Sequence, residues 1–174
     1  MSETNRQVVM VVESHWGNTR RVADRIADGL RRADPEVEVT MTAPGDSSAE
    51  VPEGTALLLV GGPTHAFSMT REKTRADAHE RGATSPMGPG IRDWIDRSEV
   101  AAEPAVRTFD TRVRHFPGSA ARSAAKALHK HGWSDAEAGE SFFVTGQEGP
   151  LADGELDRAE AWGAELARLV HVPG

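Results

Sequence analysis

Apolar residues along this chain follow two alternating patterns. Val8–Val12 is a continuous, largely β-branched run, which predicts a strand covered on both faces. Val22, Ile26 and Leu30 then recur at i, i+4 and i+8, which predicts a helix with one buried face. The chain therefore begins with a strand, a short polar connection and a helix.

The same alternation continues to the end of the chain. Residues 37–42 alternate apolar and polar side chains, which predicts a half-exposed strand, whereas 56–60 is a continuous apolar run. Residues 105–109 and 141–145 supply two more strands. Helices are predicted at 91–95, at 119–131 with Gly132 as its C-cap, and after a capping Asp153.

Strands that alternate with helices predict an α/β fold with a doubly wound, five-stranded parallel sheet. The first and third strands read as fully buried and central, and the second reads as an edge. The order 2-1-3-4-5 satisfies these requirements and predicts a ligand crevice where the first and third strands diverge. The length of 174 residues fits a single domain over residues 1–174.

Composition excludes several classes of function. The chain has no cysteine, which excludes disulfides, thiol catalysis and cysteine-ligated metals. Its net charge of −7 argues against nucleic acid as a partner and permits docking on basic proteins. The polar first residues and the absence of a long apolar run lead us to expect a cytoplasmic protein without membrane contact.

The turn between the first strand and helix is suited to holding an anion. It reads Ser14-His15-Trp16-Gly17-Asn18-Thr19, with hydroxyl groups beside the N–H groups of a helix N-terminus and with no Lys or Arg. The motifs G-x-x-x-x-G-K-[ST] and G-x-G-x-x-G are both absent. The alternative interpretation is a capped helix without a ligand.

Two further loops are expected at the same edge of the sheet. Residues 61–70 and 110–118 are rich in Gly, Thr, His and Phe, beyond what a simple turn requires. Such loops offer polar groups for the edge of a planar heterocycle and flat side chains for its faces. Asp110, the first residue of the second loop, is interpreted as part of this ligand-facing surface, and the alternative is that it only caps a turn.

Taken together, these segments resemble the flavodoxin family over essentially the whole chain. The resemblance rests on Ser-x-x-Gly-Asn-Thr at 14–19, Gly-Gly-Pro-Thr-His-Ala-Phe at 61–67 and Phe-Asp-Thr-Arg at 109–112. Flavodoxin is itself an example of the strand order given above, with FMN at the switch point. The resemblance implies non-covalent FMN bound by residues of three loops, namely Ser14, His15, Trp16, Gly17, Asn18, Thr19, Pro63, Thr64, His65, Ala66, Phe67, Phe109, Asp110, Thr111, Arg112, His115 and Phe116.

Two departures from the family pattern bear on function. Trp16 stands where Thr is common, so a hydroxyl is replaced by an indole N–H. The chain has no tyrosine, so Phe67, Phe116 or Trp16 stacks on the flavin or one face stays open. An open face would suit a substrate.

Other conspicuous residues have structural interpretations. No spacing of His and Asp matches a metal motif, so no metal is expected. Trp94, Trp133 and Trp162 are expected to be packing residues. The polar stretch 70–83, continued to Gly90, is interpreted as a mobile solvated helix, with a lid or a docking surface as alternatives.

The leading hypothesis is an electron carrier that uses FMN and works with redox partner proteins, a reductase and an electron acceptor, as a monomer or weak homodimer. One alternative is an FMN-dependent NAD(P)H:quinone-type oxidoreductase, although no dinucleotide fingerprint is present. The other is a binding module that keeps the fold without flavin.

Overall fold

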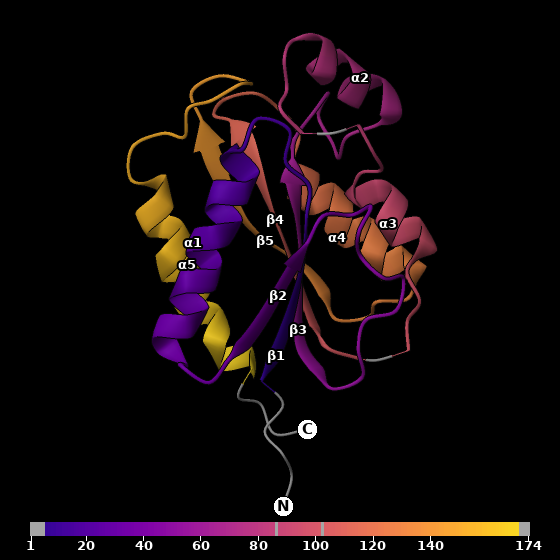
Figure 1. Cartoon of the computed structure of the whole chain (residues 1–174), viewed down its shortest axis with the longest axis vertical. Helices are drawn as coiled ribbons and strands as arrows, with labels where there is room; N and C mark the ends of the chain where they lie inside the picture. The colour runs from indigo at the N-terminus through magenta and orange to yellow at the C-terminus, as the bar shows by residue number, and fades with distance from the viewer. Residues whose placement is uncertain (1–5, 86, 102, 171–174) are drawn as a thin grey trace, which may run out of the picture.

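The structure is a computed structural model that describes residues 6–85, 87–101 and 103–170. Five strands and five helices follow one another in this part of the chain (Figure 1). In order they are β1 (Gln7–Val12), α1 (Asn18–Ala33), β2 (Glu38–Thr42), β3 (Thr55–Pro63), α2 (Glu72–Glu80), α3 (Ile91–Arg97), β4 (Ala105–Val113), α4 (Ala120–His131), β5 (Ala136–Val144) and α5 (Glu155–Val170). Residues 1–5 and Pro86, discussed above from sequence, lie outside the described residues.

The five strands form one parallel sheet in the order β2-β1-β3-β4-β5, which confirms the predicted fold class. β1 pairs with β2 on one side and β3 on the other, so Val11 has Thr42 and Val60 as register partners. The order reverses between β1 and β3, and in parallel sheets this is where a crevice opens at the carboxyl ends of the strands.

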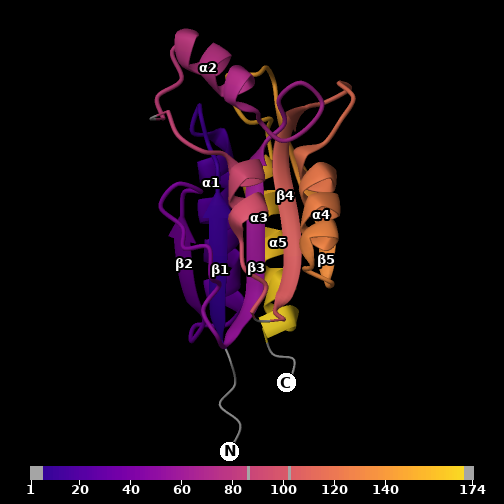
Figure 2. The ribbon, with the colours of Figure 1, turned by 90° about the vertical axis from the view of Figure 1, so that its right-hand side faces the viewer.

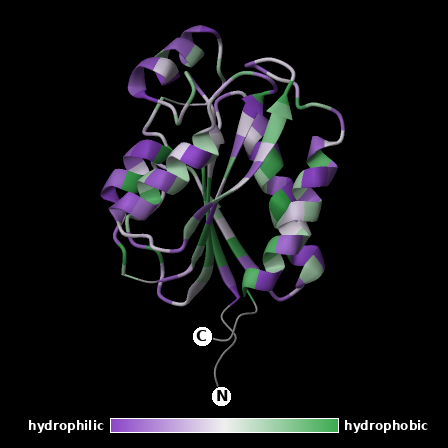
Figure 3. Ribbon diagram, turned by 180° about the vertical axis from the view of Figure 1, so that it is seen from behind, coloured by the Kyte–Doolittle hydropathy of each residue, from purple (hydrophilic) through white to green (hydrophobic). Residues whose placement is uncertain are grey.

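Helices cover both faces of the sheet. α1 and α5 pack on one face and α3 and α4 on the other, while α2 lies beyond the carboxyl ends of the strands (Figures 1 and 2). β1 contributes side chains to both hydrophobic cores. Val8 and Met10 belong to the core beneath α1 and α5, and Val11 belongs to the core beneath α3 and α4. Figure 3 shows the hydrophobic strands between helices whose outer faces are hydrophilic.

The predicted packing residues lie between these layers. Trp94 and Trp133 are fully buried beneath α3 and α4, and Trp162 is half-buried against Phe109 and Phe142. Gly132 ends α4 with φ of 119°, as predicted for a C-cap. No helix in the described ranges is long and apolar enough to cross a membrane.

Strands β3 and β4 run further than the sequence pattern predicted, whereas β5, predicted at 141–145, spans Ala136–Val144. β3 continues through Gly61 and Gly62 to Pro63, and β4 continues through Asp110 to Val113, because the two strands stay paired as far as Pro63 and Thr111. The segment from Asp110 to Val113 is therefore strand and not loop, which corrects that expectation. Alternation along a strand then sends neighbouring side chains to opposite faces of the sheet.

Candidate functional site

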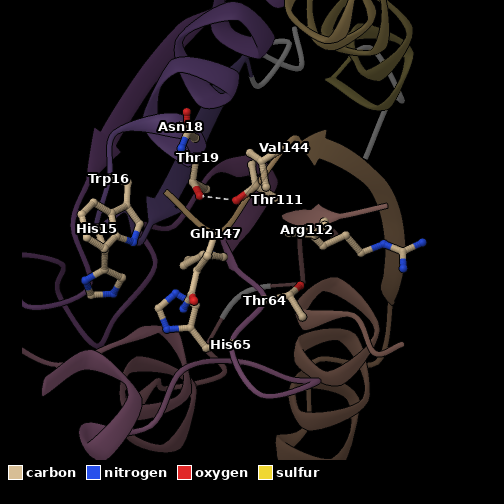
Figure 4. Close-up of a pocket in the computed structure, with 12 residues that line it drawn as sticks. His15, Trp16, Asn18, Thr19, Thr64, His65, Thr111, Arg112, Val144 and Gln147 are labelled. Carbon is tan, nitrogen blue, oxygen red and sulfur yellow. Dashed lines mark hydrogen bonds between the residues drawn. The ribbon is translucent and has the colours of Figure 1, made fainter. Parts of the chain in front are cut away.

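The carboxyl edge of the sheet holds two adjoining cavities. The inner one, of about 40 Å³, lies at the start of α1 beside Trp16 and Thr19 (Figure 4). The outer one, of about 400 Å³, is lined in part by Phe67 and Phe116. Thr64, His65, Arg112, Val113 and Gln147 line both, so the two cavities form one continuous site. The volume of the outer cavity falls within the range of small-molecule sites.

The loop from β1 to α1 closes the inner cavity. Gly17 is the N-cap of α1 with φ of 90°, a left-handed conformation that glycine adopts without strain. A Cβ at Gly17 would meet nothing within 4 Å, so its backbone conformation, and not crowding, is what requires glycine. The amide of Asn18 donates to the Glu148 carbonyl at 3.2 Å and ties this loop to the β5–α5 connection.

A buried hydrogen-bond network supports this loop from below. Glu13 is 3% exposed and its carboxylate lies 2.6 Å from His15 Nε2. It also accepts hydrogen bonds from the Thr70 hydroxyl at 2.5 Å and the Ile91 N–H at 2.8 Å. Burial raises the pKa of Glu13, but the hydrogen bonds from His15, Thr70 and the Ile91 N–H and the electrostatic interaction with His15 together outweigh burial, so the net pKa is lowered. Glu13 thus stays ionised and fixes the position of the His15 imidazole.

Three buried nitrogens of residues that line the site have no protein partner: Trp16 Nε1, His65 Nδ1 and Arg112 Nε. His65 is 4% exposed, and its Nδ1 has no hydrogen-bond partner. Burial, helped by the charge of His15, lowers the pKa of His65 to about 4, so the ring is neutral near pH 7. Trp16 Nε1 is also buried without a partner. Because buried polar groups are normally hydrogen-bonded, these atoms are available to bond a ligand in the site.

Hydroxyl groups join α1 to β4 at the floor of the site. Thr19 Oγ1 lies 2.7 Å from Thr111 Oγ1, and both residues are buried (Figure 4). Thr64 instead accepts a hydrogen bond through its hydroxyl from the Ala120 N–H at 3.0 Å and so caps the start of α4.

Two exposed phenyl rings form the rim of the outer cavity. Phe67 and Phe116 are each 65% exposed. Phe67 has φ of 76° and His115 has φ of 72°, conformations that non-glycine residues adopt rarely and that are concentrated at functional sites. The loops touch at Gly118, where an added Cβ would come within 2.2 Å of the Phe67 carbonyl oxygen.

Most of the sequence-predicted residues meet in these cavities. The linings include His15, Trp16, Asn18, Thr19, Pro63, Thr64, His65, Ala66, Phe67, Thr111, Arg112 and Phe116. Ser14 and Gly17 belong to the loop around the inner cavity without lining it, and Ser14 Oγ accepts from the Arg20 N–H at 3.3 Å. His115 is exposed at the tip of its loop and lines neither cavity.

Phe109 and Asp110 point elsewhere. Phe109 is fully buried in the core and contacts Trp162 at 6.2 Å between ring centroids. Asp110 accepts hydrogen bonds from the Ser119 hydroxyl at 2.5 Å and the Ala121 N–H at 2.9 Å, so it caps α4. The reason is the extended β4: Phe109 and Thr111 face α1 and α5, and Asp110 faces α4.

The sequence reasoning missed the contribution of the last strand. Val144, Thr145, Gly146 and Gln147 line the site from the end of β5, and Val113, Pro117 and Gly118 complete the β4 loop. The position of residues 144–147 at the carboxyl end of the fifth strand was a signal for them, since all parallel strands end at the same edge.

The segment from Thr70 to Gly90 is anchored to the site loop. The Thr84 N–H donates to the His15 carbonyl at 3.1 Å, and the Ser85 hydroxyl donates to the Ser14 carbonyl. Arg75 is buried and donates to Thr70 and Asp93, both at 3.0 Å. These contacts differ from the freely solvated helix expected from the polar sequence, because distant partners satisfy its polar groups. The described residues contain no group of three or more His, Asp or Glu that could hold a metal ion.

No family model matches the chain, and no curated protein matches it. A flavodoxin from the domain Archaea superimposes with a TM-score of 0.65 at 17% identity, covering 94% of this chain and 98% of that chain. For a flavone reductase the TM-score is 0.57 at 12% identity, with coverage of 94% and 62%. For flavodoxin 2 from Bacillus cereus it is 0.55 at 16% identity, with coverage of 94% and 97%. At these identities the likeness shows the fold.

Proposed function

We propose that this chain, which has the flavodoxin-like fold, binds FMN non-covalently and transfers electrons between redox partner proteins. The observation that carries the proposal is the set of unpartnered buried nitrogens, Trp16 Nε1, His65 Nδ1 and Arg112 Nε, in a cavity at the strand-order switch point. A fold at low identity leaves the function open, so the proposal depends on this site.

The inner cavity fits the phosphate end of the cofactor. The N-terminus of α1 presents free N–H groups and the positive end of the helix dipole. The indole N–H of Trp16 adds a further donor in place of the hydroxyl that the family pattern has at this position. The hydroxyls of Thr19 and Thr111 bond to each other and keep acceptor and donor capacity for a ligand.

The outer cavity fits the flavin ring. Phe67 and Phe116 offer flat apolar faces on its two sides. His65 Nδ1 is placed to bond a polar edge, and at neutral pH the uncharged imidazole adds no charge there. FMN, when bound, supplies one- and two-electron chemistry, while the residues of this chain position the cofactor and exclude water from its inner part.

A reductase that acts directly on a small substrate is the second candidate. The wide outer cavity and the high exposure of both phenyl rings favour it, because they leave room beside a bound ring system. The fold likeness to a flavone reductase is compatible with it. The described residues contain no Gly-rich loop of the dinucleotide-binding type, so we prefer the electron-carrier function.

Ligand titration of the apoprotein tests the cofactor. We expect FMN to bind more tightly than riboflavin, because each charge-assisted hydrogen bond to the phosphate contributes about 1.5–3 kcal/mol. Trp16→Phe keeps an aromatic ring and removes the N–H, so it should lower FMN affinity by roughly tenfold or more and leave riboflavin affinity unchanged. Equal affinity for both ligands would exclude the phosphate site.

Anaerobic stopped-flow mixing of the FMN-loaded protein with NAD(P)H separates the two candidate functions. An electron carrier should be reduced slowly by NAD(P)H alone and quickly when a partner reductase is added. Direct reduction at ordinary enzyme rates, about 1–1000 per second, would favour the oxidoreductase.

A further inference from the structure

Charge is divided unequally between the two ends of the sheet. The loops at the carboxyl ends of the strands, residues 13–21, 63–90, 112–122 and 145–154, carry nine Lys and Arg and six Asp and Glu. The segments leading into the strands, residues 34–37, 46–54, 98–104 and 132–135, carry eight Asp and Glu and no Lys or Arg. The end that holds the cavities is therefore net positive in a chain whose total charge is −7.

Three arginines belong to the segments around the site, and one of them, Arg112, lines both cavities. Arg112 donates weakly to the Phe116 and Gly118 carbonyls at 3.4 Å. Arg114 is exposed, with its guanidinium 4.4 Å from the centre of the Phe143 ring. Arg81, also exposed, donates at 2.8 Å to the side chain of Gln147, which lines both cavities.

None of these arginines forms an ion pair within the described ranges, although Arg114 lies near enough to Glu155 to help lower the pKa of that carboxyl group. By contrast, Arg25 on α1 pairs with Asp157 and Glu160, and Arg107 on β4 pairs with Asp135 and Glu137. The unpaired guanidinium groups at the mouth keep their charge available for a partner.

Acidic groups near the mouth do not cancel its net positive charge. No Asp or Glu lines either cavity. Glu13 and Asp110 are buried and directed into hydrogen bonds within the protein. Glu148 beside Gln147 is the nearest exposed carboxylate on that loop, and Glu155 and Glu140 bind Arg158.

We propose that the cavity mouth formed by Phe67, Phe116, Arg81, Arg112 and Arg114 docks an acidic face of a redox partner protein. This inference rests on the proposed electron-transfer function. The total charge of −7 permits docking on a basic protein, but a docking face is selected by local charge.

A protein face fits this surface better than a small anion does. The two exposed rings line the outer cavity together with Arg112, and aromatic residues and Arg are the types enriched at protein interfaces. Arg81 and Arg114 come from different loops, and each already contacts another side chain of the protein. An acidic protein surface can contact Arg81 and Arg114 at the same time while each keeps its present side-chain contact, whereas a small anion would require both side chains to move toward it.

The test uses the purified protein, with and without added FMN, and a defined acidic probe, a sixteen-residue poly-L-glutamate peptide, with poly-L-lysine of equal length as its counterpart. Calorimetry measures affinity, and backbone amide NMR shifts map the contact. We expect the glutamate peptide to shift the amide signals of residues 67, 114–116 and 118, with an affinity that falls about tenfold or more as salt rises from low to physiological strength.

Matched variants identify the arginines responsible. The double variant Arg81→Gln/Arg114→Gln should weaken glutamate-peptide binding by about fivefold or more. The control is Arg31→Gln/Arg168→Gln, which removes the same charge from the last turns of α1 and α5. It should change the affinity less than about twofold. Arg112 is left in place because it lines the cofactor site.

Preferential binding of the lysine peptide at the mouth would overturn the proposal. So would equal loss of affinity in the two variant pairs. Inorganic tripolyphosphate that binds as tightly as the glutamate peptide, with the same loss in the Arg81/Arg114 variant, would replace the protein face by a small-anion site. Peptide binding without any FMN binding would leave the acidic docking face standing and refute the proposed cofactor.

Discussion

The carboxylate of Glu13 holds the imidazole of His15 at 2.6 Å, directly beneath the loop that closes the inner cavity. The same carboxylate accepts from Thr70 and from the N–H of Ile91 at the start of α3. One buried charge thereby joins β1 to the segment after β3 and to α3. The position of the site loop depends on a residue that does not line the cavity.

Glu13→Gln should destabilise the protein by about 3 kcal/mol, because it removes the charged member of a buried hydrogen-bonded network. The folded-state pKa of Glu13 is lowered, so its contribution is fully present above the unfolded value near 4.5 and is lost as pH falls through the folded pKa. Urea unfolding of both proteins between pH 7 and pH 3.5 measures this difference. Glu53→Gln, at an exposed carboxylate, is the control.

His65 should make the free energy of unfolding depend on pH as well, at higher pH than Glu13 does. Its folded pKa is about 4 against 6.5 for the free side chain, so the unfolded state binds more protons between these values. Stability should therefore fall as pH decreases from about 6.5 to 4, by up to roughly 3 kcal/mol. His65→Gln should flatten this part of a urea-unfolding profile, whereas His79→Gln on exposed α2 should leave it unchanged. A profile with equal slopes in all three proteins would contradict the placement of His65.

Asp110→Asn should lower stability by about 1–2 kcal/mol, because Asp110 caps α4 through Ser119 and the Ala121 N–H. Since the side chain points away from the cavities, affinity for FMN should stay within about twofold, as expected for a residue without ligand contact. Urea unfolding and ligand titration of the same preparation measure both effects. Asp46→Asn, at an exposed position, controls for loss of charge. A large fall in affinity at unchanged stability would return Asp110 to the binding site.

Comparing Gly118→Ala with Gly82→Ala should separate the effect of steric crowding on stability from that of backbone strain. Gly118 and Gly82 both have positive φ, of 93° and 97°, but only at Gly118 would a Cβ meet the backbone of Phe67, at 2.2 Å. We expect Gly82→Ala to cost about 1 kcal/mol from strain alone and Gly118→Ala to cost about 2–4 kcal/mol. The second change should also weaken ligand binding, because it displaces Phe67 from the rim. Thermal unfolding and FMN titration measure the two effects, and similar values for the two variants would show that the loops can separate freely.

Much of the fold could be predicted because its signals are local. The continuous apolar runs of β1 and β3 identify central strands, and the alternation around Val39 identifies an edge, since burial on two faces or one leaves different patterns. The same logic places the first loop at the carboxyl edge, and Trp16 and Thr19 do line the inner cavity. The ends of strands were less predictable, because pairing with a neighbour carried β4 four residues further than its apolar run.

The sequence by itself determined the layered α/β order, the crevice and the set of loops that surround it. Tertiary structure alone decided which side chains enter that crevice. The pairing of β4 with β3 and β5 turns Thr111 toward Thr19 and Asp110 toward α4, although the two are neighbours in sequence. It also decided that Arg81 reaches Gln147, across 66 residues of chain, and thereby gives the mouth of an acidic protein a local positive charge. Side-chain direction and local charge depend on contacts between distant segments, which periodicity and composition do not encode.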